Sequence, residues 1–198
     1  MVRHLFCSFK NIEKRVIFLI IIAVSGNAKH GKDKSKELIA KALKQFGKRV
    51  KTENLSTHIG SLAVKFFKWD GNKDEPGRTL LQETGMKIME KNKYFWVDNV
   101  AIPLYALGID IYDFVLIDVR FPSDIKRLKE IFGESNVITL RVNRVGYKSS
   151  LTEKQKSHIS ETALKNYEFD YVINTREGLD FLRAEVRKFM TNFDIYGS

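Results

Sequence analysis

Cysteine and proline are scarce in this sequence of 198 residues, which contains one cysteine, Cys7, and three prolines. A single cysteine excludes a disulfide framework and a cysteine-based zinc site, and it favours a reducing compartment such as the cytoplasm. With three prolines and twelve glycines, the chain has neither a collagen-like nor a low-complexity composition. Hydrophobic residues make up 43% of the chain and charged residues 29%, so we expect an ordinary globular protein.

Long apolar runs are also lacking. The run at residues 16–24 (VIFLIIIAV) has nine residues, whereas a membrane-spanning helix needs about 20. Basic residues precede this run, as they do in a secretory signal. However, Ser25 and Gly26 follow it and open a glycine-framed loop that makes sense only after a strand. We therefore interpret the run as a buried parallel β-strand, expect no membrane association, and assign residues 1–15 to an N-terminal extension.

Positive charge is in excess, because 34 Lys and Arg residues against 24 Asp and Glu give a formal net charge of +10. Such an excess is typical of proteins with anionic partners, and nucleic acids, membrane surfaces and phosphorylated metabolites all qualify. A solvated, lysine-rich surface explains the total charge equally well. The positions of the basic residues are therefore more informative than their number.

Buried strand patterns alternate with amphipathic segments along most of the chain. Strands are predicted at residues 16–24, 49–53, 114–119, 137–142 and 169–173. Helices are predicted at residues 32–46, 54–69, 78–91, 94–107, 123–132, 158–166 and 176–193, with Ser123 as an N-cap. This alternation predicts an α/β fold, in which a five-stranded parallel sheet has helices on both faces. We expect one domain over residues 16–198, with a short basic lid at about 143–157.

Residues 26–32 (GNAKHGK) match the phosphate-loop motif G-x-x-x-x-G-K and stand between a predicted strand and a predicted helix. The glycines let backbone N–H groups curl around a phosphate, and the helix N-terminus adds the positive end of its dipole. Lys32 is placed to reach the outer phosphates of a nucleotide. The strand, loop and helix together make this a specific prediction of nucleotide binding.

Two carboxylates are candidate ligands for the Mg²⁺ ion that accompanies a bound nucleotide. Asp33 stands where most phosphate loops have Ser or Thr. It either binds the ion, directly or through water, or only favours the dipole of the first helical turn. Asp118 ends a buried strand pattern, and a carboxylate at the carboxyl end of a parallel strand faces the ligand crevice. Arg120 follows, and its planar guanidinium is suited to clamp a phosphate.

Several segments together resemble the deoxynucleoside monophosphate kinases of bacteriophages and their bacterial relatives. The phosphate loop (SGNAKHGKD) has the Asp that this family places after the lysine. Residues 78–85 (RTLLQETG) resemble its R-x-L-x-Q-x-x-G segment, and Trp96 follows in FWVDNVA. Residues 118–122 (DVRFP) resemble its D-x-R-F-P segment. Residues 158–161 (HISE) resemble its H-x-S-E segment, which precedes a last strand, here FDYVIN.

The resemblance implies a P-loop kinase fold that transfers a phosphoryl group from ATP, with Mg²⁺, to a (deoxy)nucleoside monophosphate. The implied ATP-binding residues are Gly26, Asn27, Ala28, Lys29, His30, Gly31, Lys32 and Asp33. Arg141 is added to them because several cations must surround two negatively charged groups that approach each other. The implied acceptor-binding residues are Arg78, Gln82, Trp96 and Arg120. The implied catalytic residues are Lys32 and Arg120, and Arg144 of the predicted lid is added as a further cation that would surround the approaching phosphates. Asp33 and Asp118 are the implied metal ligands.

The chain departs from this family mainly on the acceptor side. Residues 55–60 (LSTHIG) lack the lysine of the family's F-A-x-x-L-K segment, and Lys34 replaces its usual Thr. Kinases of the phosphomevalonate and dephospho-coenzyme A types therefore stay as alternatives, as does a P-loop module that binds nucleotide or nucleic acid without transfer. Nucleic acid is the less favoured partner, because the sequence has no helix-turn-helix signature and no aromatic-basic stripe. The oligomeric state is open, and a homodimer is one option.

Overall fold

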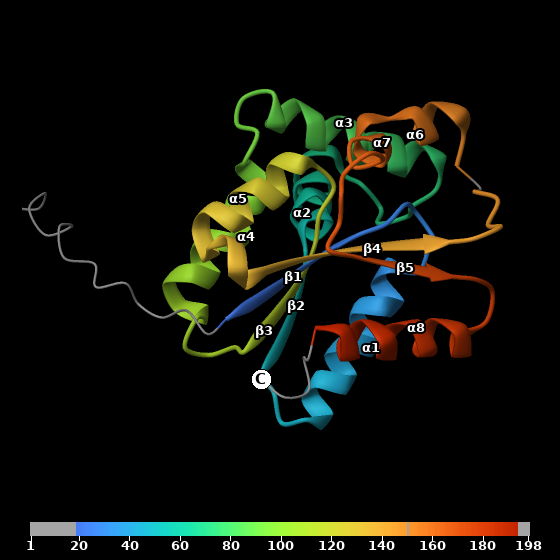
Figure 1. Ribbon diagram of the computed structural model, residues 1–198. Helices are drawn as coiled ribbons and strands as arrows, with labels where there is room; N and C mark the ends of the chain where they lie inside the picture. The colour runs from blue at the N-terminus through green and yellow to red at the C-terminus, as the bar shows by residue number, and fades with distance from the viewer. Residues whose placement is uncertain (1–18, 150, 194–198) are drawn as a thin grey trace, which may run out of the picture.

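The computed structural model describes residues 19–149 and 151–193, and a five-stranded sheet forms its centre (Figure 1). The strands are β1 (Ile20–Ser25), β2 (Val50–Asn54), β3 (Phe114–Asp118), β4 (Val137–Arg144) and β5 (Tyr171–Thr175). All neighbouring strands are parallel, in the order β2-β3-β1-β4-β5. The predicted α/β fold with a five-stranded parallel sheet is therefore confirmed. The predicted extension at 1–15, with Cys7, and the predicted strand residues 16–18 lie outside the described residues.

Strand β1 is central and apolar on both of its faces. Ile21 and Ala23 belong to the core on one side of the sheet, Ile22 and Val24 to the core on the other, and all four are fully buried. Successive side chains of a strand point to opposite faces, so a strand that is covered on both sides is apolar throughout. The register places Val24 opposite Asp118 of β3. The loop after β1 and the acid that ends β3 consequently lie at the same edge of the sheet.

Helices cover both faces of the sheet, as the alternation predicts (Figure 1). One face is covered by α1 (Lys32–Gln45) and α8 (Leu179–Asn192). The other face is covered by α2 (Leu55–Phe67), α4 (Phe95–Pro103) and α5 (Pro122–Phe132). The remaining helical elements are α3 (Glu75–Met89), the π-helix η1 (Leu104–Gly108), the 3-10 helix η2 (Glu134–Asn136), α6 (Glu153–Ser157) and α7 (Ile159–Thr162). Among the residues described, no helix has the length and apolar character to span a bilayer.

The start of α5 differs from the prediction in one respect. The N-cap is Phe121, and Ser123, the predicted cap, lies inside the first turn. The capping role belongs to Asp124, whose carboxylate accepts hydrogen bonds from the backbone N–H groups of Arg120 and Phe121, each at 3.0 Å. An acid in the first turn thus satisfies two backbone donors that precede the helix.

The segment predicted as a lid is more regular than its sequence suggests. β4 extends through Arg144, and α6 fills the last five residues of the predicted segment. Thr152 caps α6 by accepting from the Gln155 N–H at 3.3 Å. The side chain of Gln155 is 3% exposed and donates to the Glu75 carbonyl oxygen at 3.1 Å. This bond fixes α6 to the first turn of α3, and the lid function itself stays a prediction.

Candidate active site

The phosphate loop leaves the carboxyl end of β1 and leads into α1, which begins at Lys32. Its two glycines are required by geometry. Gly31 has a φ of +95°, which residues with side chains rarely adopt. A Cβ at Gly26 would lie 2.8 Å from the carbonyl oxygen of Val142, which is too close for any larger residue. The backbone N–H groups at the start of a 14-residue helix are thus available to an anion.

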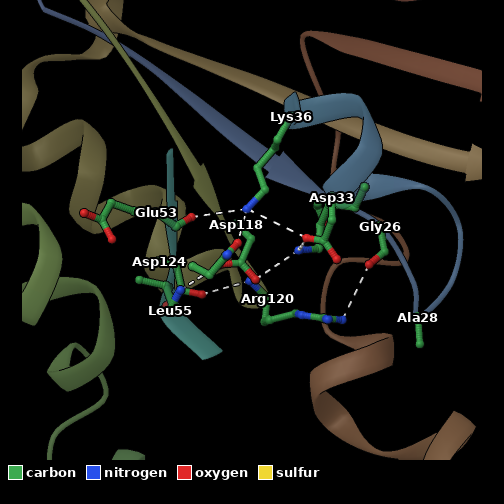
Figure 2. A network of polar contacts seen from close by, with 12 residues as sticks. Gly26, Ala28, Asp33, Lys36, Glu53, Leu55, Asp118, Arg120 and Asp124 are labelled. Carbon is green, nitrogen blue, oxygen red and sulfur yellow. Dashed lines mark hydrogen bonds and ion pairs between the residues drawn. The ribbon is translucent and has the colours of Figure 1, made fainter. Parts of the chain in front are cut away.

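Lys32 lies between the two carboxylates that are predicted to bind magnesium. Its Nζ is 3.0 Å from Asp33 Oδ1 and 3.0 Å from Asp118 Oδ2, and its side chain is only 7% exposed. Asp118 is buried at the end of β3, and its Oδ1 accepts a hydrogen bond from the Leu55 N–H at 2.7 Å (Figure 2). The fold therefore brings the predicted phosphate lysine and both predicted metal ligands into one cluster.

Both carboxylates are ionised at neutral pH. Burial alone would raise the pKa of Asp118, but the ammonium of Lys32, followed by Lys36 and Arg120, outweighs it and lowers that pKa. At Asp33, desolvation by the surrounding protein would likewise raise the pKa, but the ammonium of Lys32 outweighs it and lowers that pKa. The two acids differ in access, because the side chain of Asp33 is 80% exposed and that of Asp118 is 2% exposed.

This donor set fits a magnesium ion that arrives with a nucleotide. Mg²⁺ takes oxygen ligands, and in kinases it is held by one or two carboxylates together with phosphates and water. Among residues 19–149 and 151–193, no three or more His, Cys, Asp or Glu side chains are grouped so that they could hold a metal ion. Asp33 and Asp118 would therefore share the ion with the phosphates, with Asp33 as the accessible ligand.

Asp33→Ala is expected to raise the magnesium concentration that gives half-maximal phosphoryl transfer. The substitution removes the exposed carboxylate of the cluster, so the ion loses a protein ligand. Asp33→Ser should recover much of the loss, because a hydroxyl is the ligand that other phosphate loops use at this position. Magnesium titrations of the wild type and both variants measure the effect.

Thermal melts of the same three proteins supply the comparison for Asp33. If Asp33 only favours the dipole of the first helical turn, Asp33→Ala loses about 0.3–1 kcal/mol of stability and keeps the magnesium requirement of the wild type. An unchanged magnesium requirement would contradict the metal role of Asp33 and leave Asp118 as the remaining predicted metal ligand.

A second buried lysine, Lys36, enters the site one helical turn after Lys32. Its ammonium donates to the Glu53 carbonyl oxygen at 3.2 Å and to the side-chain oxygen of Asn54, and it lies 3.9 Å from Asp33 Oδ1 (Figure 2). Burial lowers the pKa of Lys36 to about 8, although the charge of Asp118 opposes the shift. Lys36 joins α1 to the end of β2. Sequence reasoning missed it, and its i, i+4 spacing from Lys32 was the available signal.

Asp124 is a second site residue that sequence reasoning missed. It is 2% exposed and lines the cavity described below. Burial raises its pKa to about 6, although the hydrogen bonds from the Arg120 and Phe121 N–H groups oppose the rise. Because the ordinary value is 3.8, the folded state holds the proton of Asp124 in a pH range where the unfolded state has lost it.

The raised pKa of Asp124 predicts a pH dependence of stability. Its contribution is largest below about pH 4 and is lost as the pH rises through 6, because ionisation is then harder in the folded protein. Asp124→Asn removes this titration. The difference in free energy of unfolding, wild type minus variant, should therefore fall by about 2–3 kcal/mol between pH 4 and pH 7. Urea unfolding at several pH values measures it, and a difference that does not change with pH would contradict the assignment.

A cavity of about 270 Å³ lies beside the phosphate loop. Lys32, Asp33 and Arg120 line it where it meets the loop. The cavity also contains the other three predicted acceptor residues, Arg78, Gln82 and Trp96. Its apolar lining comes from α2, α3 and α4 and from the start of α5, and includes Leu55, Ile59, Leu81, Met86, Met89, Trp96 and Phe121. An apolar cavity with a few convergent polar groups is typical of a site for a small molecule.

The acceptor-side residues differ in how they are held. The Trp96 side chain is buried, and its Nε1 donates to the Gly85 carbonyl oxygen at 3.1 Å, so the ring forms part of the cavity wall. Arg78 is partly exposed in the first half of α3, where its Nε donates to the Lys73 carbonyl oxygen at 2.9 Å. Gln82 follows one turn later on the same helix. Arg78 and Gln82 are thus placed to meet a polar group of a ligand.

The two arginines of β4 lie beside the phosphate loop and outside the cavity lining. Arg141 donates to Ser25 Oγ at 3.0 Å and contacts the side-chain oxygen of Asn27. The Arg144 N–H donates to Nδ1 of His30 at 3.1 Å. Burial, and then the charge of Arg141, lowers the pKa of His30, which keeps this ring nitrogen available as an acceptor. Both arginines therefore support the loop from β4, and their contacts with ATP stay predictions.

Comparison with known proteins supports the fold. No protein-family model matches this sequence, and a search of curated proteins finds no match. Among solved structures, a sugar kinase from Janibacter sp. is similar, with a TM-score of 0.53 and 11% identity over 89% of this chain and 95% of that chain. A dephospho-CoA kinase from Campylobacter jejuni is similar with a TM-score of 0.51 and 12% identity, over 88% of this chain and 97% of that chain.

These similarities place the chain among proteins with the P-loop kinase fold, as the sequence predicts. At identities of 11% and 12%, the similarity indicates the fold and does not identify a substrate. Membership of the deoxynucleoside monophosphate kinase family stays a prediction from the sequence motifs.

Proposed function

We propose that this protein transfers the terminal phosphoryl group of ATP to a small phosphorylated acceptor, and that the acceptor is a (deoxy)nucleoside monophosphate. The observation that carries the proposal is the continuity of the cavity with the phosphate loop. Lys32, Asp33 and Arg120 line the cavity where it meets the loop, and Arg78 contributes a further cation from α3. A donor phosphate on the loop and an acceptor phosphate in the cavity would therefore approach each other among cations.

The chemistry asks little of the protein beyond positioning and charge neutralisation. An acceptor phosphate oxygen is already ionised at neutral pH, so a general base is not required. Lys32 would accept the charge that concentrates on the transferring phosphate, and Arg78 and Arg120 would hold the acceptor. A magnesium ion held by Asp33, Asp118 and the phosphates would neutralise donor charge. The apolar wall of the cavity would exclude water and so limit hydrolysis of ATP.

Other acceptors fit the same arrangement less specifically. Phosphomevalonate and dephospho-coenzyme A also carry phosphates for Arg78 and Arg120, but the resemblance of residues 78–85 to the R-x-L-x-Q-x-x-G segment favours a nucleoside monophosphate. A P-loop module without transfer activity does not require an apolar cavity that places arginines beside the loop. The cytoplasmic location and the homodimer option predicted from the sequence stay predictions.

A substrate panel tests the proposed function. The purified protein is incubated with Mg·ATP and each of the common nucleoside and deoxynucleoside monophosphates, and with phosphomevalonate and dephospho-coenzyme A, while formation of ADP is followed. The proposal expects ADP formation that depends on at least one nucleoside monophosphate. Turnover confined to phosphomevalonate or dephospho-coenzyme A would support kinase activity but would contradict the nucleoside monophosphate as the acceptor. ADP formation that no acceptor stimulates would contradict the proposal.

A further inference from the structure

A buried carboxylate lies against the phosphate loop. Glu161 of α7 has a side chain that is 8% exposed. Its Oε2 accepts a hydrogen bond from the Ala28 N–H at 3.1 Å, and its Oε1 pairs with Arg120 Nη1 at 2.9 Å. Arg120 in turn donates to the Gly26 carbonyl oxygen at 3.5 Å (Figure 2). One carboxylate thus joins α7, the phosphate loop and the segment after β3, which are far apart in the sequence.

The negative charge of Glu161 is unexpected beside a phosphate loop. A phosphate loop attracts anions, so a carboxylate beside Ala28 repels the ligand that the loop serves. The ion pair of Glu161 with Arg120 explains why a negative charge is present here. An arginine has a large rotamer entropy, much of which is lost when its guanidinium is held in one geometry. Glu161 restricts Arg120 before any ligand binds, and the Ala28 N–H in turn restricts Glu161.

The segment that carries Glu161 is itself fixed. The N-cap of α7 is His158, whose ring nitrogen accepts a hydrogen bond from the Ser160 N–H at 3.2 Å. Just before it, Gln155 bonds to the start of α3 through the Glu75 carbonyl oxygen. Ser160 and Glu161 both line the acceptor cavity. Hydrogen bonds therefore connect the segment that carries Glu161 to α3 on one side and to the phosphate loop on the other.

We propose that Glu161 is a positioning residue that holds the Arg120 guanidinium between the phosphate loop and the acceptor cavity. It acts on phosphoryl transfer through Arg120 and has no chemical step of its own. This inference rests on the proposed function, because Arg120 matters most where two phosphates meet. It also predicts that the effect of removing Glu161 depends on whether Arg120 is present.

A double-mutant cycle in kcat tests this dependence, with the nucleoside monophosphate that the wild type uses best. Glu161→Gln keeps the shape of the side chain and removes its charge. We expect it to lower kcat by about tenfold to a hundredfold, since a misplaced group costs up to about a hundredfold in rate. In an Arg120→Ala background the same change should alter kcat less than about twofold. Glu161→Asp, which keeps the charge on a shorter stem, should also lower kcat.

Glu153→Gln is the matched control, because Glu153 lies on neighbouring α6 with its side chain 89% exposed and forms a surface ion pair with Lys156. It should keep the kcat of the wild type. Equal losses from Glu161→Gln with and without Arg120 would show a purely structural role and overturn the proposal. A gain in kcat would overturn it as well, because Glu161 would then be an inhibitory group that competes with phosphate.

A binding readout separates this proposal from the proposed function. Calorimetry with inorganic pyrophosphate needs no turnover. We expect Arg120→Ala to weaken pyrophosphate binding about tenfold in the wild type and less than about twofold in the Glu161→Gln protein. Additive losses would overturn the positioning role whether or not the protein is a kinase. Coupled losses without turnover of any acceptor would keep the positioning role and contradict the proposed function.

Discussion

Lys32→Ala is expected to lower the rate of phosphoryl transfer by about a hundredfold or more. Preorganised cations act on charge that develops during the reaction, and removing one such donor commonly costs about a hundred- to a thousandfold in kcat. Lys32 is the first residue of α1, and its ammonium lies within 3.0 Å of both candidate metal ligands. Steady-state assays of ADP formation measure the loss.

The same substitution also affects stability, which the assay must separate from catalysis. Removing Lys32 takes one partner from the buried Asp118, and breaking a buried ion pair costs about 3–5 kcal/mol. Lys36, Arg120 and the Leu55 N–H remain near that carboxylate and reduce the cost. Adding Asp118→Asn to Lys32→Ala should therefore recover stability in urea unfolding without recovering the rate.

Lys34→Ala is the matched control for Lys32. Lys34 lies on the same turn of α1, is 43% exposed and pairs with Glu37 at the surface. Its removal should leave the rate within about twofold of the wild type, because exposed ion pairs contribute little. A Lys32→Ala protein that folds and retains most of its turnover would contradict the assignment of the phosphate loop.

Arg78→Ala is expected to raise the KM for the acceptor by about thirtyfold or more and to leave the KM for ATP nearly unchanged. Losing one cation from a desolvated phosphate contact costs about 2–5 kcal/mol. Arg78 lines the cavity from α3, whereas the proposed ATP site is the loop between β1 and α1. Saturation curves for each substrate, with the other held in excess, measure both constants.

Lys87→Ala controls for loss of a positive charge from α3, because Lys87 is exposed and does not line the cavity. It should change neither KM. Equal increases in both KM values for Arg78→Ala would contradict its placement on the acceptor side.

The central features of the fold could be predicted because they rest on local sequence. A buried strand followed by GNAKHGK admits few structures, since Gly31 needs a positive φ and Gly26 leaves no room for a Cβ. Asp118 could be placed because parallel strands end at the same edge of a sheet. The predicted acceptor residues were taken from the family resemblance, and the structure brings Arg78, Gln82, Trp96 and Arg120 to one cavity.

The residues that were missed depend on contacts between distant segments. From its sequence position alone, Lys36 is an ordinary helical lysine. Only the structure shows that its ammonium contacts the Glu53 carbonyl oxygen of β2. Asp124 reads as a first-turn acid, and its burial follows only from the packing of α5. Glu161 stands within the H-x-S-E resemblance, but its contact with Ala28, which spans 133 residues, could not be predicted from that motif. Side-chain periodicity along one element carries no information about such partners.

The most direct test of the account follows the phosphoryl group itself. ATP labelled with ³²P in its γ-phosphate is incubated with the protein, Mg²⁺ and each nucleoside monophosphate, and the labelled products are separated. We expect the label to appear in a nucleoside diphosphate, and we expect the Lys32→Ala protein to lose this product. Label that appears only in inorganic phosphate, or that stays in ATP with every monophosphate, would contradict the proposed function.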